Sequence, residues 1–431
     1  MKGYRALITG CALVMAGAAA AQVAPDAPAA SAPCLTFADA LAQAARVAPT
    51  VGIAAARLAE SEAELMQARS LFRPQVSSFA RTGFGDTGLT DSRIENQLGV
   101  RVTQRVFDFG DSRFAREAAR AGIAASQSDI AAEQATAAET VGRDYLAWLE
   151  AGERLRATRE RETYFEQQLT ATEKLLVTGG ATVSDRADIE AEALEAQSAR
   201  IELEFLIERF AARLAINTRQ RNLPCSHDDA AQAIARLTAN NAIAEPGTRG
   251  ADDPTNNPRI EALRRTVDRL AAQAEREAAA RYPVVNVGGI SSYAFDDLRG
   301  GGAIRNRVGI DLSLPLYSGN AQTARVQAAR ARTEQARGRV DEARRQLEED
   351  LSIATRRVTA LRAQSSRRAR AMQARAEQLT AAQLQFERNL RTLPELIEVR
   401  LMYETALLAS IETSYETLRQ QLAIVRLNGG L

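Results

Sequence analysis

Two long stretches of the chain contain no proline, and they limit the fold more than any other feature. They run from about Asp111 to Val177 and from about Ala321 to Arg388, and both are rich in Ala, Leu, Glu, Gln and Arg. Nothing in such a composition stops a helix. At 1.5 Å per residue, a helix of this size would extend on the order of 100 Å, well beyond an ordinary domain. We therefore expect long helices that pack side by side.

The two stretches belong to an internal repeat. A proline opens a helical pattern in each half, Pro49 in the first and Pro258 in the second, and another proline ends each pattern. Each long stretch is followed by a turn and by a return helix. The predicted units are residues 35–217 and 258–428, joined by an inter-repeat linker or equatorial segment at 218–257.

Each half also carries two strand-like segments before its long helix. They predict β-hairpins at 74–107 and 283–316. In the second strand of each hairpin, at Leu98–Val106 and Val308–Leu316, apolar residues alternate with polar ones. A half-buried soluble sheet has the same period, so alternation alone does not decide for a membrane. The strands cover about 10 residues each, which is enough to cross a bilayer when tilted.

The number of strands has a consequence for assembly. Two hairpins supply four strands, whereas the smallest closed membrane barrels use about 8. An open sheet edge in lipid leaves backbone groups unsatisfied, so hairpins that enter the membrane require several chains to close the barrel. The polar loops at 85–96 and 296–302 are expected to face the outside of the cell.

The N-terminus has the three parts of a secretory signal peptide. Lys2 and Arg5 precede an apolar run, and small residues follow from Gly17 to Ala21. We therefore assign residues 1–21 to a signal peptide and 22–34 to an N-terminal tail. Lipid attachment at Cys11 is the less favoured interpretation, because the apolar run continues past this residue.

Removal of the signal peptide leaves two cysteines, Cys34 and Cys225, in a chain destined for an oxidising compartment. A disulfide between the starts of the two halves is one interpretation, and two unpaired thiols are the other. The sequence does not give the separation of the two residues, so both remain open.

Composition and motifs argue against an enzyme. Lys and Arg total 55 against 54 Asp and Glu, so nothing indicates a nucleic-acid partner. The single histidine, His227, lies in the linker beside Asp228, without a serine or cysteine nucleophile motif around it. No P-loop or metal-ligand spacing is present. We expect no catalytic residues, no cofactor and no metal site.

The order of these features resembles the TolC-like outer membrane efflux family, the outer membrane factors. The segments that carry the resemblance are Phe72–Gln75, Thr103–Asp108 and the turns between the long and return helices. The resemblance implies a mainly α protein with a membrane β-barrel. Long antiparallel α-helical hairpins would form a trimeric α-barrel tunnel, and four strands per chain would enter a shared twelve-stranded β-barrel.

The resemblance also implies a location, a function and partners. The chain would sit in the outer membrane with a large periplasmic portion, as a passive exit duct for drugs, small molecules or type I secreted proteins. Its partners would be two further copies, a periplasmic adaptor (membrane fusion) protein, an inner-membrane pump of RND or ABC type, and outer-membrane lipid. The alternative is a soluble periplasmic coiled-coil adaptor or scaffold, although adaptors usually have one helical hairpin and this chain has two.

In the family, the helix tips form a periplasmic gate. By this resemblance Arg391 is the gate arginine, Glu395 and Glu398 are the acidic pair, and Asp185 lies at the repeat position of Glu395. We expect a contact between Asp185 and Arg391 that helps to hold the entrance closed; helix capping is the alternative role of Asp185. The residues expected to dock the adaptor are Gly179, Gly180, Ala181, Asn389, Leu390 and Thr392.

Overall fold

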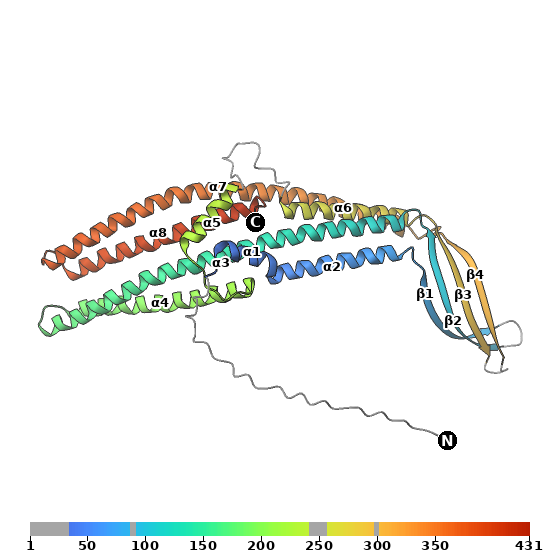
Figure 1. Cartoon of the computed structure of the whole chain (residues 1–431), viewed down its shortest axis with the longest axis horizontal. Helices are drawn as coiled ribbons and strands as arrows, with labels where there is room; N and C mark the ends of the chain where they lie inside the picture. Colours follow the sequence, from blue (N-terminus) through green and yellow to red (C-terminus); the bar gives the residue numbers. More distant parts are fainter. Residues whose placement is uncertain (1–33, 87–91, 241–256, 297–300) are drawn as a thin grey trace, which may run out of the picture.

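The computed structural model describes residues 34–86, 92–240, 257–296 and 301–431. The two halves contain the same order of elements (Figure 1). The first half has α2 (Pro49–Ser70), β1 (Gln75–Asp86), β2 (Ser92–Phe107), α3 (Asp111–Val177) and α4 (Val183–Thr218). The second has α6 (Pro258–Ala279), β3 (Val284–Asp296), β4 (Gly301–Ser313), α7 (Ala321–Glu387) and α8 (Leu393–Leu427). Among the described residues, no helix has the length and apolarity needed to cross a bilayer.

Several predictions fall on residues that the structure does not describe. The signal peptide and most of the tail lie in 1–33, which includes Cys11. The outer parts of the two predicted external loops, at 87–91 and 297–300, and the linker residues 241–256 also lie outside the described residues. These assignments stay predictions.

The prolines of the repeat begin helices as expected. Pro49 and Pro258 occupy the first turns of α2 and α6, where a backbone amide hydrogen has no partner inside the helix. An additional helix, α1 (Phe37–Val47), precedes α2 and was not predicted. It ends at Val47, and the next residue, Ala48, has the extended backbone that a following proline favours.

One strand boundary and one helix differ from the sequence-based prediction. The second β-hairpin was expected to reach residue 316, but β4 ends at Ser313, because Pro315 has no amide hydrogen for the strand ladder. The linker, for which no helix was predicted, contains α5 (His227–Asn240), which packs against α8 and α1. The His227 ring lies edge-on to Tyr415, with 5.2 Å between the ring centres.

The helices form a curved array with α3 at its centre (Figure 1). Near the sheet the order of packing is α2, α3, α6 and α7, and towards the other end it is α4, α3, α8 and α7. The sheet is antiparallel with the order β1, β2, β3 and β4. The elements β1, α2 and α4 therefore form one edge of the chain, and β4 and α7 form the other.

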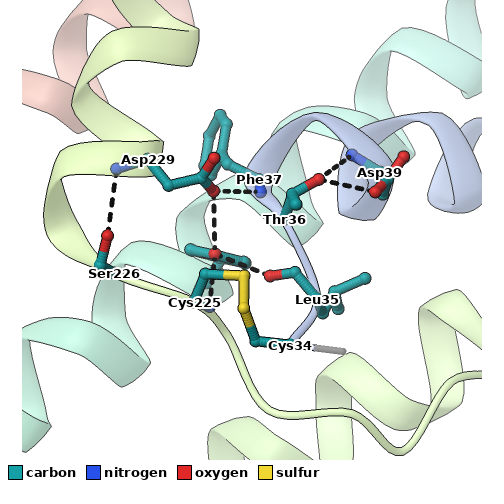
Figure 2. The surroundings of a disulfide bond; sticks show 9 residues. Cys34, Leu35, Thr36, Phe37, Asp39, Cys225, Ser226 and Asp229 are labelled. Atoms are coloured by element: carbon teal, nitrogen blue, oxygen red, sulfur yellow. Dashed lines mark hydrogen bonds between the residues drawn. A yellow bond between two sulfur atoms is a disulfide. The ribbon is translucent and has the colours of Figure 1, made fainter. Parts of the chain in front are cut away.

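The largest core cluster lies at the middle of the array, where Tyr145 of α3 is fully buried. A disulfide joins Cys34 and Cys225, with Cα atoms 5.0 Å apart (Figure 2). The Tyr145 hydroxyl donates a hydrogen bond to the Leu35 carbonyl (2.8 Å) and accepts one from the Cys225 amide (2.9 Å). Burial raises the pKa of Tyr145 above its ordinary value. The start of the first half is thus fastened to the linker through α3.

Candidate functional site at the helix tips

Two helix tips lie together at the end of the molecule opposite the sheet (Figure 1). We call residues 178–182, between α3 and α4, the first tip, and residues 388–392, between α7 and α8, the second tip. All of the residues proposed for adaptor docking belong to these two turns.

The two tips share one backbone design. Gly179 has φ 75° and Asn389 has φ 55°, so both occupy the left-handed region that ends a helix. The next residue in each tip then closes the turn. The Gly180 amide donates to the Leu175 carbonyl (2.8 Å), and the Leu390 amide donates to that of Gln385 (2.9 Å). Asparagine fills the role of glycine in the second tip because it tolerates this conformation.

Each return helix begins with a threonine held by an acidic side chain. The Thr182 amide and hydroxyl donate to Oδ2 of Asp185, at 2.9 and 2.8 Å. The Thr392 amide and hydroxyl donate to Oε2 of Glu395, both at 2.8 Å. These contacts satisfy backbone donors that a helix start leaves free. Capping, the alternative considered for Asp185, is therefore present in the chain.

The capping contacts also keep both carboxylates ionised. The backbone hydrogen bond from Thr182, followed by that of its hydroxyl, lowers the pKa of Asp185. The corresponding bonds from Thr392, with a further contribution from the nearby Arg391 charge, lower the pKa of Glu395. The first turns of α4 and α8, which directly follow the tips, therefore carry negative charge at neutral pH.

The structure brings the proposed gate residues to one end without joining them all. Glu395 and Glu398 are exposed on successive turns of α8. Among the ion pairs of the described residues, none links Asp185 to Arg391. Arg391 is half-buried, and its shielded Nη1 has no hydrogen-bond partner within the described chain. The expected contact is thus not made inside one chain, and a contact between chains stays a prediction.

An apolar cluster joins the two helical hairpins just behind the tips. Phe165 of α3 and Ile189 of α4 are fully buried, and Leu393, Ile397 and Leu401 of α8 pack against them. Ile397 lies between the two exposed glutamates in sequence, Leu393 precedes Glu395, and Leu401 follows Glu398 by three residues. The acidic residues are consequently presented on a helix whose other face is fixed.

A network of charged side chains lies farther from the tips and was not predicted. Arg161 of α3 pairs with Glu192 of α4, and its Nε lies 3.4 Å from Oε2 of Glu404 on α8. Arg400 donates to the same Glu404 (2.8 Å), and its guanidinium lies 4.3 Å from the Tyr164 ring centre. Burial raises the pKa of Glu404. These residues are far apart in sequence, so no spacing could have indicated the network.

No cluster of histidine, cysteine and acidic side chains suited to a metal ion occurs among the described residues.

The sequence profile of the outer membrane efflux protein family matches residues 40–222 and 255–430. This match covers both repeats. The chain belongs to the outer membrane efflux protein family.

Solved structures with the same fold include several outer-membrane proteins. VceC from Vibrio cholerae is 17% identical, with a TM-score of 0.71, and the match covers 91% of this chain and 96% of VceC. CmeC from Campylobacter jejuni is 14% identical, with a TM-score of 0.74 and coverage of 91% and 85%. The open state of MtrE from Neisseria gonorrhoeae is 15% identical, with a TM-score of 0.70 and coverage of 92% and 89%. A comparison with curated proteins gave no significant match.

Membership of the outer membrane efflux protein family settles the general role. The protein is an outer-membrane efflux channel with a periplasmic helical extension, and it is not an enzyme. Family members are trimeric channels of tripartite efflux pumps. The alternative of a soluble periplasmic adaptor is therefore set aside.

Proposed function

We propose that three copies of this outer membrane efflux protein form a single exit duct, entered through a gate at the helix tips. A periplasmic adaptor docks on the first and second tips, and an inner-membrane pump of the RND or ABC type supplies the energy. The duct carries drugs, other small molecules or type I secreted proteins. The channel itself contributes only a conduit, a gate and a charge selection.

The open sheet is the observation that carries this proposal. β1 and β4 each pair with one neighbour, and no other strand of the described residues lies against their outer edges. Val308, Ile310 and Leu312 of β4 share one face and are 84%, 75% and 65% exposed. A sheet with an apolar face and free edges is stable in lipid only when it closes on itself. Three copies supply twelve strands, enough for a closed barrel.

An aromatic cluster at the junction of strands and helices supports the same orientation. The rings of Phe107 and Phe109 lie 4.6 Å apart, and Phe109 stacks on Tyr282 at 5.4 Å. Tyr317, in the segment that joins β4 to α7, is 85% exposed. Aromatic residues collect where a membrane barrel meets the aqueous phase. The junction is therefore the level at which the duct leaves the membrane for the periplasm.

The gate is assigned to charged residues in the second tip and in the helix starts that follow the two tips. Threefold symmetry turns Glu395 and Glu398 into rings of carboxylates, which favour cations in a narrow aqueous pore. Arg391 has a shielded Nη1 that lacks an acceptor within the described chain, and Asp185 of a neighbouring copy can supply one. The capping contacts of Asp185 fall on Oδ2, so its other oxygen is available to such a partner.

The experiment is conductance of purified trimers in planar bilayers. Replacing Arg391 with Gln and Asp185 with Asn is expected to raise the resting conductance, because the closing contacts are lost. Glu395→Gln with Glu398→Gln is expected to lower the preference for cations. Glu348→Gln, at an exposed α7 position far from the tips, is the control and should change neither property. Unchanged conductance in the first variant would reject the gate, and a stable monomer in detergent would reject the duct.

A further inference from the structure

The two faces of the β-sheet differ in chemistry. In an antiparallel sheet, residues directly paired across strands project to the same side, and successive residues of a strand project to opposite sides. Val102 of β2 pairs with Val76 of β1 and Gly289 of β3, and Gly289 pairs with Val308 of β4. This side is the apolar face, and the register places further exposed apolar side chains on it, among them Leu98, Tyr293, Ile304, Ile310 and Leu312.

The opposite face of the sheet carries arginines. Arg101 of β2 pairs with Ile290 of β3, which pairs with Arg307 of β4. Arg305 and Arg81 project to the same side, on positions nearer the hairpin loops. All four arginine side chains are exposed. We call Arg81, Arg101, Arg305 and Arg307 the sheet arginines.

Side-chain contacts agree with this assignment of faces. The Arg101 guanidinium lies 5.5 Å from the ring centre of Phe79, which the register places on the same side. Gln97 Nε2 donates a hydrogen bond to Ser292 Oγ (2.8 Å), and both residues also belong to this side. The polar face is therefore a continuous surface across β1 to β4.

The charge of the sheet arginines is not neutralised inside the chain. In the described part of the protein, none of the four makes an ion pair. Arg105 lies on the same face but differs from them, because its Nη1 lies 2.7 Å from Oδ2 of Asp111. Among the side chains of this face that the structure describes, the acidic one is Asp311, four residues along β4 from Arg307. That spacing is about 14 Å, so the face keeps an excess of positive charge.

The location of the sheet decides what the two faces meet. The protein is an outer-membrane channel with a periplasmic helical extension, so the sheet, at the end opposite the tips, is its membrane part (Figure 1). Arginine on a lipid-facing strand position costs about 2–4 kcal/mol at the bilayer midplane. The apolar face therefore meets lipid. In the proposed closed trimer, the face with the sheet arginines lines the duct.

We propose that the sheet arginines form an anion-binding surface in the outer part of the duct. Its ligands are exported molecules that carry carboxylate, sulfonate or phosphate groups. The guanidinium fork matches the geometry of these groups, and arginines that line a pore favour anions. The inference rests on the proposed duct and adds a substrate class to it. The duct then has acidic side chains at its periplasmic entrance and basic ones at its outer end.

Block by a multivalent phosphate tests this surface. Inositol hexakisphosphate is added on the sheet side of purified trimers in planar bilayers at about 0.1 M salt, where charges are screened beyond about 10 Å. It is expected to lower the conductance reversibly. Arg101→Gln with Arg307→Gln should raise the half-blocking concentration at least about tenfold, because charge-assisted hydrogen bonds are lost.

Two controls separate charge from size and from folding. Arg101→Lys with Arg307→Lys keeps the charge at the same positions and should keep most of the block. Raffinose, a neutral sugar, should block neither the unmodified protein nor the variants. If the double glutamine variant does not form trimers, Arg305→Gln alone tests the same point, with a smaller rise in the half-blocking concentration.

The reversal potential in a salt gradient gives a second measurement. The double glutamine variant should shift it towards cations, whereas Glu395→Gln with Glu398→Gln should shift it towards anions. Conducting trimers with the same phosphate block and the same reversal potential in the glutamine and lysine variants would overturn the anion surface and leave the duct intact. Equal block by raffinose would also overturn it. Absence of conducting trimers in the unmodified protein would instead remove the duct itself.

Discussion

α3 and α7 have the same length and the same place in the repeat, yet their surroundings are opposite. Each is 67 residues long. α3 lies at the centre of the array and buries 22 residues, among them Tyr145 and Phe165. α7 lies at the edge, buries 11 residues, and carries most of its arginines on the exposed side. The position of a repeat in the array, not its length or periodicity, decides what its side chains must do.

The difference shows where each half derives its stability. The first half is fixed around the middle of α3, where α1, the linker and α8 of the second half meet. The second half has no such centre on α7 and depends on α6 and α8. Substitutions in α3 should therefore destabilise the chain more than those on the outer face of α7.

The largest effect is expected at Tyr145. Tyr145→Ala removes a fully buried ring and the hydroxyl that joins Leu35 to Cys225, and it should lower the free energy of unfolding by about 3–5 kcal/mol. Gln327→Ala, at an exposed α7 position, should change it by less than about 0.5 kcal/mol. Denaturant unfolding followed by circular dichroism measures both. Equal losses in the two variants would contradict the distinction between α3 and α7.

The disulfide gives the next largest effect. It closes a loop with a sequence separation of 191 residues, so replacing Cys34 and Cys225 together with Ser should cost about 2–4 kcal/mol. In the second half the Asn257 side chain donates to the Leu427 carbonyl (2.9 Å) and accepts from the Arg259 amide (3.0 Å), so it caps α6 and links its start to α8. Asn257→Ala should cost only about 1 kcal/mol. Treating the unmodified protein with a reductant should reproduce the first loss, and insensitivity to reduction would refute it.

Much of this architecture could be predicted from sequence, because the signals were local. The absence of proline gave both long helices, and Gly179 and Asn389 gave the turns that end them. The two helices outside the repeat pattern were harder to predict. α1 was missed because Pro49 was the first strong helix-start signal, and α5 was missed because the prolines of this segment marked it only as a linker between the halves.

Contacts between distant segments set the limit of prediction at the site. Asp185 and Glu395 were placed correctly near helix starts because capping is a local interaction. The Arg161–Glu404 network joins three helices, and no sequence spacing encodes it. Cys34 and Cys225 could be named as partners but not shown to pair, since their approach depends on how α1 and the linker fold around α3.

A smaller effect is expected from the network that links the halves. Arg161→Met removes a cation shared by Glu192 and Glu404, and should cost about 1–3 kcal/mol because Glu404 stays buried with Arg400 as its remaining partner. Arg159→Met breaks a comparable α3–α4 pair with Glu204 that is largely exposed. It should cost at most about 1 kcal/mol. Thermal unfolding of both variants decides the matter, and similar losses would show that the contact with α8 adds nothing.

The smallest expected effect is a difference between the two tips in the pH at which their capping contacts are lost. The folded pKa values of Asp185 and Glu395 lie below the ordinary 3.8 and 4.5. Capping is therefore fully present above those ordinary values and is lost as the pH falls through the lowered ones. Hydrogen exchange at the Thr182 and Thr392 amides, corrected for intrinsic rates, reports this loss directly.

Within one chain, Arg391 affects the carboxylate beside one tip and not the one beside the other. Its charge helps to lower the pKa of Glu395 and is not among the causes that act on Asp185. The contacts within one chain predict that Arg391→Gln shifts the loss of protection at Thr392 to higher pH and leaves that at Thr182 unchanged. In the trimer, where the proposed gate places Arg391 beside Asp185 of the next copy, the loss at Thr182 should shift to higher pH as well, and a shift at Thr392 alone would contradict that contact. No shift at either tip would mean that Arg391 acts on neither carboxylate.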